Sequence, residues 1–380
     1  MLSPTFPPSE KQDWLVRFTK EIKDLDVSSI SQHSPSEEIN IFPYFTTGET
    51  PPHNLSALLP PKTESGWEHT FEVTAKTSNS EILAALNFGA NSLYVSEISA
   101  NLPAQLQGVQ LSNIRSHFFV KNEQELEILH SFTSGNIDGT VAVSNSLLVG
   151  KLKQIFPKQA TIEIDTTSFH QSGSNILLEM ALALALANQY AVNDIGFRFR
   201  FAIGTDYLFE IARLRAFRIL WANLAQLKAL HPMCLIQAET SRRELSPIDT
   251  DTNLLRHTTM AMAAISGTAD SLIVRAHTLE NSDDANRLAL NIHNLLADES
   301  EFEALSDPCY GSYYIEALTE ALIDKAWEKF LWIEENGGYS GIETSGWLAA
   351  ELNRIDALRK ADLTSGKVVK VGLNKYTQKV

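Results

Sequence analysis

The chain has 380 residues, of which 44% are hydrophobic and 20% are charged, a balance typical of a globular protein. Its formal net charge of −15 argues against nucleic acid or an anionic membrane surface as a partner. The two cysteines, Cys234 and Cys309, are too few for a disulfide framework or a paired-cysteine metal site. No secretory signal or membrane-spanning stretch is recognisable, so we expect a soluble cytoplasmic protein.

Residues 1–66 are predicted to form an N-terminal helix followed by an extended arm. Trp14, Leu15, Phe18 and Ile22 recur at helical spacing. Six prolines between residues 34 and 66 then exclude long regular elements. We expect the arm to lie on another surface, because an exposed segment of this length needs support.

From Trp67 the pattern changes to short β-rich runs separated by helical segments, which defines a domain over residues 67–310. The eight runs are "HTFEVT", "NSLYVS", "SHFFV", "TVAVS", "ATIEID", "IGFRFRF", "MCLIQAE" and "SLIVRA". Only the second connection lacks a convincing helix. Eight alternating units predict an α/β fold of the (β/α)8 TIM-type barrel class. An open doubly wound sheet is the alternative, but it predicts a Gly-rich turn after the first strand, and "HTFEVTAKTSNS" has none.

Residues 311–380 are predicted to be C-terminal helices and a linker. The segment "YYIEALTEALIDKAWEKFLWIEENGGY" has an apolar stripe at helical spacing, and Gly337 and Gly338 follow it as a helix stop. A second helix is predicted over residues 342–362, followed by the basic tail "SGKVVKVGLNKYTQKV".

Candidate site residues follow from the rule that chemistry in such barrels sits where strands end and the next loop begins. The sequence has no phosphate-binding glycine loop, no HExxH, no GxSxG and no evident metal-ligand spacing, so we expect no metal. The strand ends bring cationic side chains instead, which suit a carboxylate or a phosphate-bearing ligand. The candidates are His170, Arg198, Arg200, Glu239, Arg242, Arg243, Arg275 and His277.

Each candidate also has a structural interpretation. A histidine in a loop is more often hydrogen-bonded within the fold than catalytic, and Arg242 and Arg243 in "TSRREL" are compatible with facing water. Arg198 and Arg200 alternate with phenylalanines, so they share one face of their strand. We favour the barrel interior and a salt-bridge layer for these two, with ligand contact as the alternative. The arginines of "EIARLRAFRILW" are expected at a solvated or salt-bridged rim, or at a subunit interface.

Four ordered blocks carry a resemblance to a known family. They are "DYLFEIARLRAFRILWANL", "LLRHTTMAMAAISGTADSL", "DPCYGSYYIEALTEALIDKAWEKFLWIEENGGY" and "GKVVKVGLNKY". Together they resemble the acyl-CoA mutases, specifically the methylmalonyl-CoA mutase family, over roughly residues 70–376. The resemblance implies a (β/α)8 barrel and the adenosylcobalamin-dependent interchange of methylmalonyl-CoA and succinyl-CoA.

The chain departs from the catalytic pattern of this family at several points. In catalytic members the loop after the fifth barrel strand carries a Tyr-His pair, whereas "SFHQSGSN" has Phe169 before His170, which removes a phenol donor. "TSRRELS" places Arg242 and Arg243 where a TSGWSLT-type segment has Gly and Trp, and "GTVAVSNSLL" lacks the family's glutamine segment. The Asp-x-His-x-x-Gly motif that supplies the cobalt ligand is not found in the sequence, which stops at the linker preceding that domain.

These departures resemble the small, non-catalytic subunit of the heterodimeric bacterial enzyme. That resemblance implies no catalytic residues in this chain, with Phe169 and His170 as vestigial equivalents, and no cofactor of its own. Adenosylcobalamin would belong to the catalytic large subunit, which the N-terminal arm would wrap, and the isolated chain would be prone to form homodimers. The alternative is a catalytic barrel that uses a separate cobalamin-binding protein. An unrelated barrel enzyme for anionic substrates is a third possibility, which the four blocks disfavour.

Overall fold

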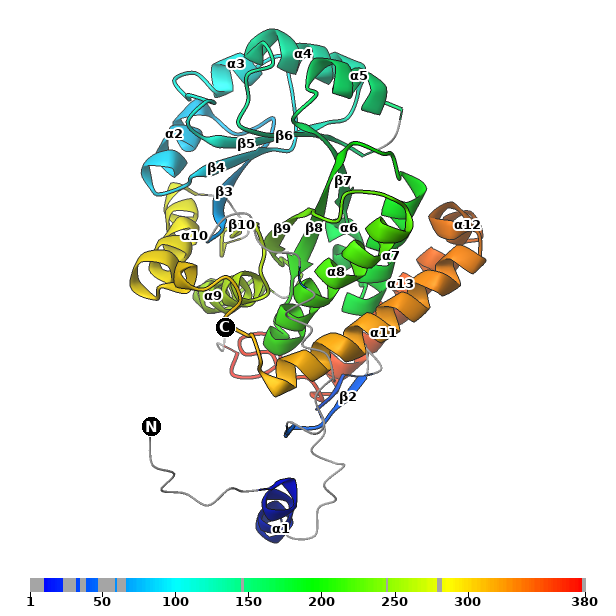
Figure 1. Cartoon of the computed structure of the whole chain (residues 1–380). Helices are drawn as coiled ribbons and strands as arrows, with labels where there is room; N and C mark the ends of the chain where they lie inside the picture. Colours follow the sequence, from blue (N-terminus) through cyan, green and yellow to red (C-terminus); the bar gives the residue numbers. More distant parts are fainter. Residues whose placement is uncertain are drawn as a thin grey trace, which may run out of the picture.

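The structure is a computed structural model that describes residues 10–22, 32–34, 39–46, 59, 66–144, 147–243, 245–278 and 282–377. Most of the predicted arm, and Asn145 at one strand end, lie outside these residues. Within the N-terminal region the predicted helix is present as α1 (Lys11–Ile22), and β1 (Gln32–Ser34) pairs antiparallel with β2 (Ile39–Ile41). The helix α1 is drawn apart from the main body (Figure 1). The Trp14 ring on α1 stacks on Tyr44 at 4.9 Å.

Eight parallel strands close into a barrel, as predicted (Figure 1). Their order around the barrel is β10, β3, β4, β5, β6, β7, β8 and β9, with each strand next to its sequence neighbour and β10 closing onto β3. The strands are β3 (Glu68–Val73), β4 (Ser92–Val95), β5 (Arg115–Val120), β6 (Gly139–Val143), β7 (Ala160–Asp165), β8 (Gly196–Ile203), β9 (Leu235–Thr240) and β10 (Ser271–Ile273).

Helices surround the barrel, and most of the connections contain one (Figure 1). The second connection contains only the four-residue α3, so the weak helical signal there was informative. None of the described helices is both long and apolar enough to cross a membrane. The helices of the barrel are α2 (Asn79–Asn87), α3 (Leu102–Gln105), α4 (Glu123–Thr133), α5 (Val149–Ile155), α6 (Thr167–Gln171), α7 (Ile176–Gln189), α8 (Tyr207–Leu227), α9 (Thr250–Ser266) and α10 (Asp283–Asn294), followed by a π-helical turn (Leu295–Glu299) and a 3-10 turn (Phe302–Ala304).

The side chains of β8 show which face of the sheet is the interior. The rings of Phe197 and Phe199 lie 4.6 and 5.0 Å from that of Trp221 on α8, so this face is covered by helix. Successive side chains alternate between faces, so Arg198 and Arg200 point into the barrel. The register supports this, because these arginines lie opposite Glu163 and Asp165 of β7, with which they form ion pairs.

The C-terminal helices pack on the outside of the barrel. α11 (Tyr313–Glu335) lies against α7 and α8, and the predicted apolar stripe of α11 is buried (Figure 1). The prediction of a single helix over residues 342–362 was wrong. The chain forms α12 (Gly338–Thr344) and α13 (Trp347–Thr364), because Gly346 between them has a φ of +77°, a conformation that interrupts a right-handed helix.

Candidate functional site at the barrel mouth

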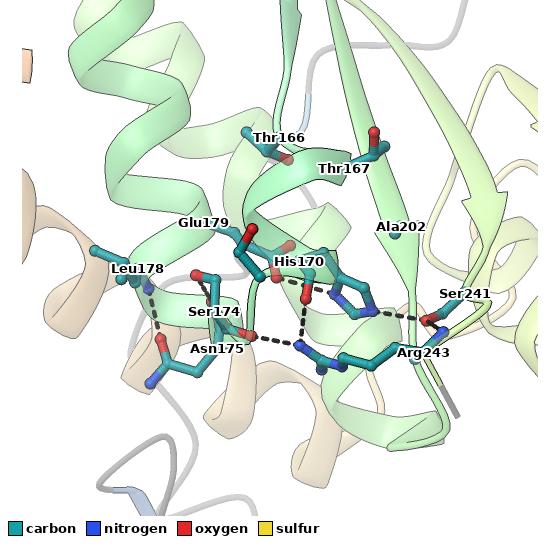
Figure 2. Close-up of polar contacts among 12 residues, drawn as sticks. Thr166, Thr167, His170, Ser174, Asn175, Leu178, Glu179, Ala202, Ser241 and Arg243 are labelled. Atoms are coloured by element: carbon teal, nitrogen blue, oxygen red, sulfur yellow. Dashed lines mark hydrogen bonds and ion pairs between the residues drawn. The ribbon is translucent and has the colours of Figure 1, made fainter. Parts of the chain in front are cut away.

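The segment after β7 places His170 beneath the mouth of the barrel. The Thr167 backbone N–H donates to the Asp165 carboxylate at 2.8 Å, and the Thr166 hydroxyl donates to the Arg200 carbonyl of β8 at 2.9 Å. These bonds start the short helix α6 directly at the strand end. Its fourth residue, His170, is only 1% exposed and points into the fold (Figure 2).

Both ring nitrogens of His170 have protein partners (Figure 2). Nδ1 lies 3.0 Å from Oε1 of Glu179 on α7, and because a carboxylate can only accept, Nδ1 is the donor. Nε2 shares a hydrogen bond of 2.7 Å with the Ser241 hydroxyl, which follows β9. The predicted alternative of a structural, hydrogen-bonded histidine therefore agrees with the observed contacts.

Glu179 connects His170 to two further buried charges, Arg213 and Glu210. Its Oε2 accepts from Arg213 of α8 at 2.6 Å, and Arg213 also donates to Glu210 at 2.9 Å. Burial would raise the pKa of Glu179, but Arg213 and His170 hold that pKa below its ordinary value. Burial raises the pKa of Glu210, so the two carboxylates are pushed in opposite directions.

Ser241, His170 and Glu179 have the connectivity of a hydrolytic triad, with hydroxyl, imidazole and carboxylate in sequence. Ser241 is 0% exposed, so no substrate carbonyl can approach its oxygen in this structure. Arg243 closes the cluster, donating to the carbonyls of His170 at 2.7 Å and Ser174 at 2.8 Å (Figure 2). The arrangement therefore positions the loop after β7 against the loop after β9, and it does not present a nucleophile.

A second network of charges fills the barrel interior above the middle of the strands. Arg200 donates to Asp165 at 2.5 Å and to Glu239 at 2.9 Å. Arg275 also binds Glu239, at 2.5 Å, and forms an ion pair with Glu72. Three sequence candidates, Arg200, Glu239 and Arg275, are thus brought together, but they bind one another.

Arg198 lies one step deeper in the interior. It forms an ion pair with Glu163, and its Nη1 donates to the Thr140 hydroxyl at 2.9 Å. Tyr94 donates to the same Glu163 at 2.8 Å, and burial and Glu163 raise the pKa of Tyr94 well above its ordinary value. The predicted salt-bridge layer of Arg198 and Arg200 is therefore present.

Of the remaining candidates, Phe169, Arg242 and His277 do not join these networks. The ring of half-buried Phe169 lies 6.2 Å from that of Tyr339 on α12, outside the hydrogen-bonded cluster around His170. Arg242 is exposed, as the water-facing alternative predicted, whereas Arg243 is half-buried. The backbone carbonyl of His277 accepts from Asn253 at 3.0 Å.

Sequence reasoning missed the partners of His170, namely Glu179, Arg213 and Ser241. A lone carboxylate in the otherwise apolar "ILLEMALALALA" was the available signal, because a charge in a buried helix needs a partner. For the arginines of α8 the solvated alternative was wrong, whereas the expected salt bridges are present. Arg213, Arg215 and Arg218 are 0%, 0% and 4% exposed, and each forms an ion pair inside the fold.

Comparison with known proteins places these features in one family. The profile of the Methylmalonyl-CoA mutase family matches residues 148–380, more than half of the chain. The chain is 25% identical to the methylmalonyl-CoA mutase small subunit of Porphyromonas gingivalis, over 98% of this chain and 70% of that protein. It is 33% identical to the methylmalonyl-CoA mutase of Cereibacter sphaeroides and 30% identical to the small subunit of Propionibacterium freudenreichii.

These last two matches each cover 58% of this chain, and 34% and 37% of the respective relatives, so the chain spans about a third of their length. The matched residues 148–380 include His170, its partners and all of the strand-end arginines described above. The chain belongs to the methylmalonyl-CoA mutase family.

Proposed function

We propose that this chain is the non-catalytic small subunit of an adenosylcobalamin-dependent methylmalonyl-CoA mutase and supports a catalytic large subunit. Two relatives similar to this chain are named as small subunits, and one of them matches along 98% of it. The full-length mutase of C. sphaeroides is also similar, so family membership alone does not distinguish the two roles.

The observation that carries the proposal is that the polar side chains around His170 and in the barrel interior are engaged with one another. Both nitrogens of His170 are occupied, and Arg200, Glu239 and Arg275 are joined by hydrogen bonds of 2.5 to 2.9 Å. A catalytic site needs groups that are free to contact the reacting atoms. A substrate entering here would have to break buried ion pairs, and removing one partner of such a pair costs about 3–5 kcal/mol.

The cofactor of the family does not fit the histidines of the mouth. A histidine that held the cobalt would need an accessible ring nitrogen without a protein partner, but His170 uses both of its nitrogens, His257 on α9 is 0% exposed, and Nδ1 of His277 is buried. We therefore propose that adenosylcobalamin is held by the partner subunit and that no step of the reaction runs through this chain.

The first experiment is a mutase assay with methylmalonyl-CoA and adenosylcobalamin on this chain alone, on the large subunit from the same genome, and on the mixture. We expect turnover only when the large subunit is present, and co-elution of the two chains at a 1:1 ratio. Turnover by this chain with a cobalamin-binding protein that lacks a barrel would refute the proposal.

A sharper version substitutes the residues at the positions of the family's Tyr-His pair. In the mixed complex we expect His170→Gln to leave kcat within about twofold of the unsubstituted complex, and Phe169→Tyr to add no activity to the isolated chain. A loss of kcat by His170→Gln of about a hundredfold, the scale of losing a general acid or base, would mean that this site is catalytic. Circular dichroism and co-elution of each variant control for misfolding.

A further inference from the structure

One side of the barrel mouth carries cationic and titratable side chains that belong neither to the cluster around His170 nor to the ion pairs of the barrel interior. The side chain of Arg242, which follows β9, makes no hydrogen bond or ion pair with any residue that the structure describes, although its backbone carbonyl accepts from Leu245 at 3.3 Å. His257 on α9 is 0% exposed, and neither of its ring nitrogens meets the geometry of a hydrogen bond in the described chain, although the carbonyl of Ala276 lies near enough to act on its pKa. Nδ1 of His277, after β10, is likewise buried and without a partner there. Buried polar groups are nearly always satisfied, so this concentration needs an explanation.

The three residues belong to segments that are tied together. The Arg275 backbone N–H donates to the Thr240 hydroxyl at 2.9 Å, which joins the end of β10 to the end of β9, two residues before Arg242. The Asn253 side chain on α9 donates to the carbonyl of His277 at 3.0 Å. His257 lies four residues after Asn253, and therefore on the same face of α9, toward His277.

The charged side chains that act on His257 are cationic. Burial lowers the pKa of His257 to about 4; the carbonyl of Ala276 opposes this, whereas His277, Arg242 and Arg275 lower it further. Burial and Arg275 likewise lower the pKa of Arg242, against Glu239 and Glu72. Both carboxylates are already engaged, Glu72 with Arg275 and Glu239 with Arg275 and Arg200. A positive field with unused donors favours an anion.

We propose that Arg242 and His277 form a binding site for a small oxyanion, with His257 as a buried positioning residue behind them. The guanidinium fork matches two oxygens of a phosphate or a carboxylate, and His277 adds a donor from a different segment. The ligand would occupy the rim of the mouth and leave the interior ion pairs intact. The site goes beyond the proposed subunit role, since it assigns a ligand to a chain without catalysis.

The test is isothermal titration calorimetry of the full chain with sulfate, inorganic phosphate and acetate. Sulfate does not titrate between about pH 6 and about pH 4, so any change of its affinity over that range comes from the protein. We expect sulfate to bind more tightly at the lower pH, by at most about tenfold per pH unit, because a bound anion favours protonated His257, whose pKa in the free chain is about 4. Acetate binding comparable to that of phosphate would identify a carboxylate ligand, and phosphate binding alone would identify a phosphate ligand.

Two variants and a control make the test specific. Arg242→Gln removes an exposed side chain without a partner in the described residues, so it leaves folding intact, and we expect it to weaken binding about tenfold or more. His257→Gln should remove much of the pH dependence. Arg287→Gln on α10, whose partner is Asp284, is the matched control and should bind like the unsubstituted chain. Absence of binding by all three anions, or equal affinity in Arg242→Gln, would overturn the proposal.

Discussion

Replacing Glu179 by leucine should destabilise the fold more than any exposed substitution. Glu179 is 1% exposed and accepts from Arg213 at 2.6 Å and from His170 at 3.0 Å, so its removal takes one carboxylate away from the buried cation of Arg213 and leaves the imidazole N–H at Nδ1 of His170 without this acceptor. Breaking a buried ion pair in this way costs about 3–5 kcal/mol. Glu179→Gln, which keeps one acceptor oxygen but loses the charge, should cost about 2 kcal/mol.

Urea unfolding at neutral pH, followed by circular dichroism, measures both free energies of unfolding. Glu127→Leu on α4 is the matched control, because Glu127 is also bound by a cation, Lys151 at 3.0 Å, but its side chain is 67% exposed. That change should stay within about 0.5 kcal/mol of the unsubstituted chain. If Glu179→Leu cost no more than the control, the cluster around His170 would not be a desolvated ion-pair network, and the argument for its positioning role would fail.

Three further predictions concern single groups. The pKa of His257 falls from 6.5 in the unfolded chain to about 4 in the folded chain. At pH values between these two, the unfolded chain therefore binds more protons than the folded chain. Urea unfolding should therefore show a loss of about 2 kcal/mol between about pH 7.5 and about pH 5 from this group; a flat profile would contradict its neutral burial. Gly150→Ala in α5, with open space around it, should raise the free energy of unfolding by about 0.5–1 kcal/mol, whereas Gly346→Ala at φ +77° should lower it by about 1 kcal/mol, and equal effects would refute the backbone argument. Burial raises the pKa of Cys234 to about 12, so its thiol should react with a disulfide reagent only after unfolding, and rapid reaction in the native chain would show that the strand end opens.

The barrel could be predicted because its strands are short, β-rich and evenly separated by helical segments. The alternation of Arg198 and Arg200 with phenylalanines even indicated which face of β8 is the interior. The break between α12 and α13 was missed, because a glycine within an amphipathic pattern is compatible with a continued helix. Only the positive φ of Gly346 in the folded chain distinguishes the two outcomes.

The arginines of α8 could not be placed from the sequence for a different reason. A helix with an apolar stripe and several arginines is usually half exposed, with the charges toward water. Here α11 covers the outer side of α8, so Arg215 is buried against Asp307 and Glu316. These partners lie about 90 to 100 residues further along the chain, and no local pattern reveals a pairing across that distance.

The site itself shows why the residue types alone did not decide its function. His170, Arg200, Glu239 and Arg275 are the kinds of side chain that bind anionic substrates, and they stand at the strand ends where such chemistry occurs. Their contacts, rather than their identities, separate a catalytic mouth from a structural one, because these side chains bind one another, although the Nε atoms of Arg200 and Arg275 have no partner among the described residues. Under the proposed function, the barrel has kept its polar residues without keeping an active site. The side chains of Arg242 and His277, which take no part in these networks, are where we propose that a small oxyanion binds.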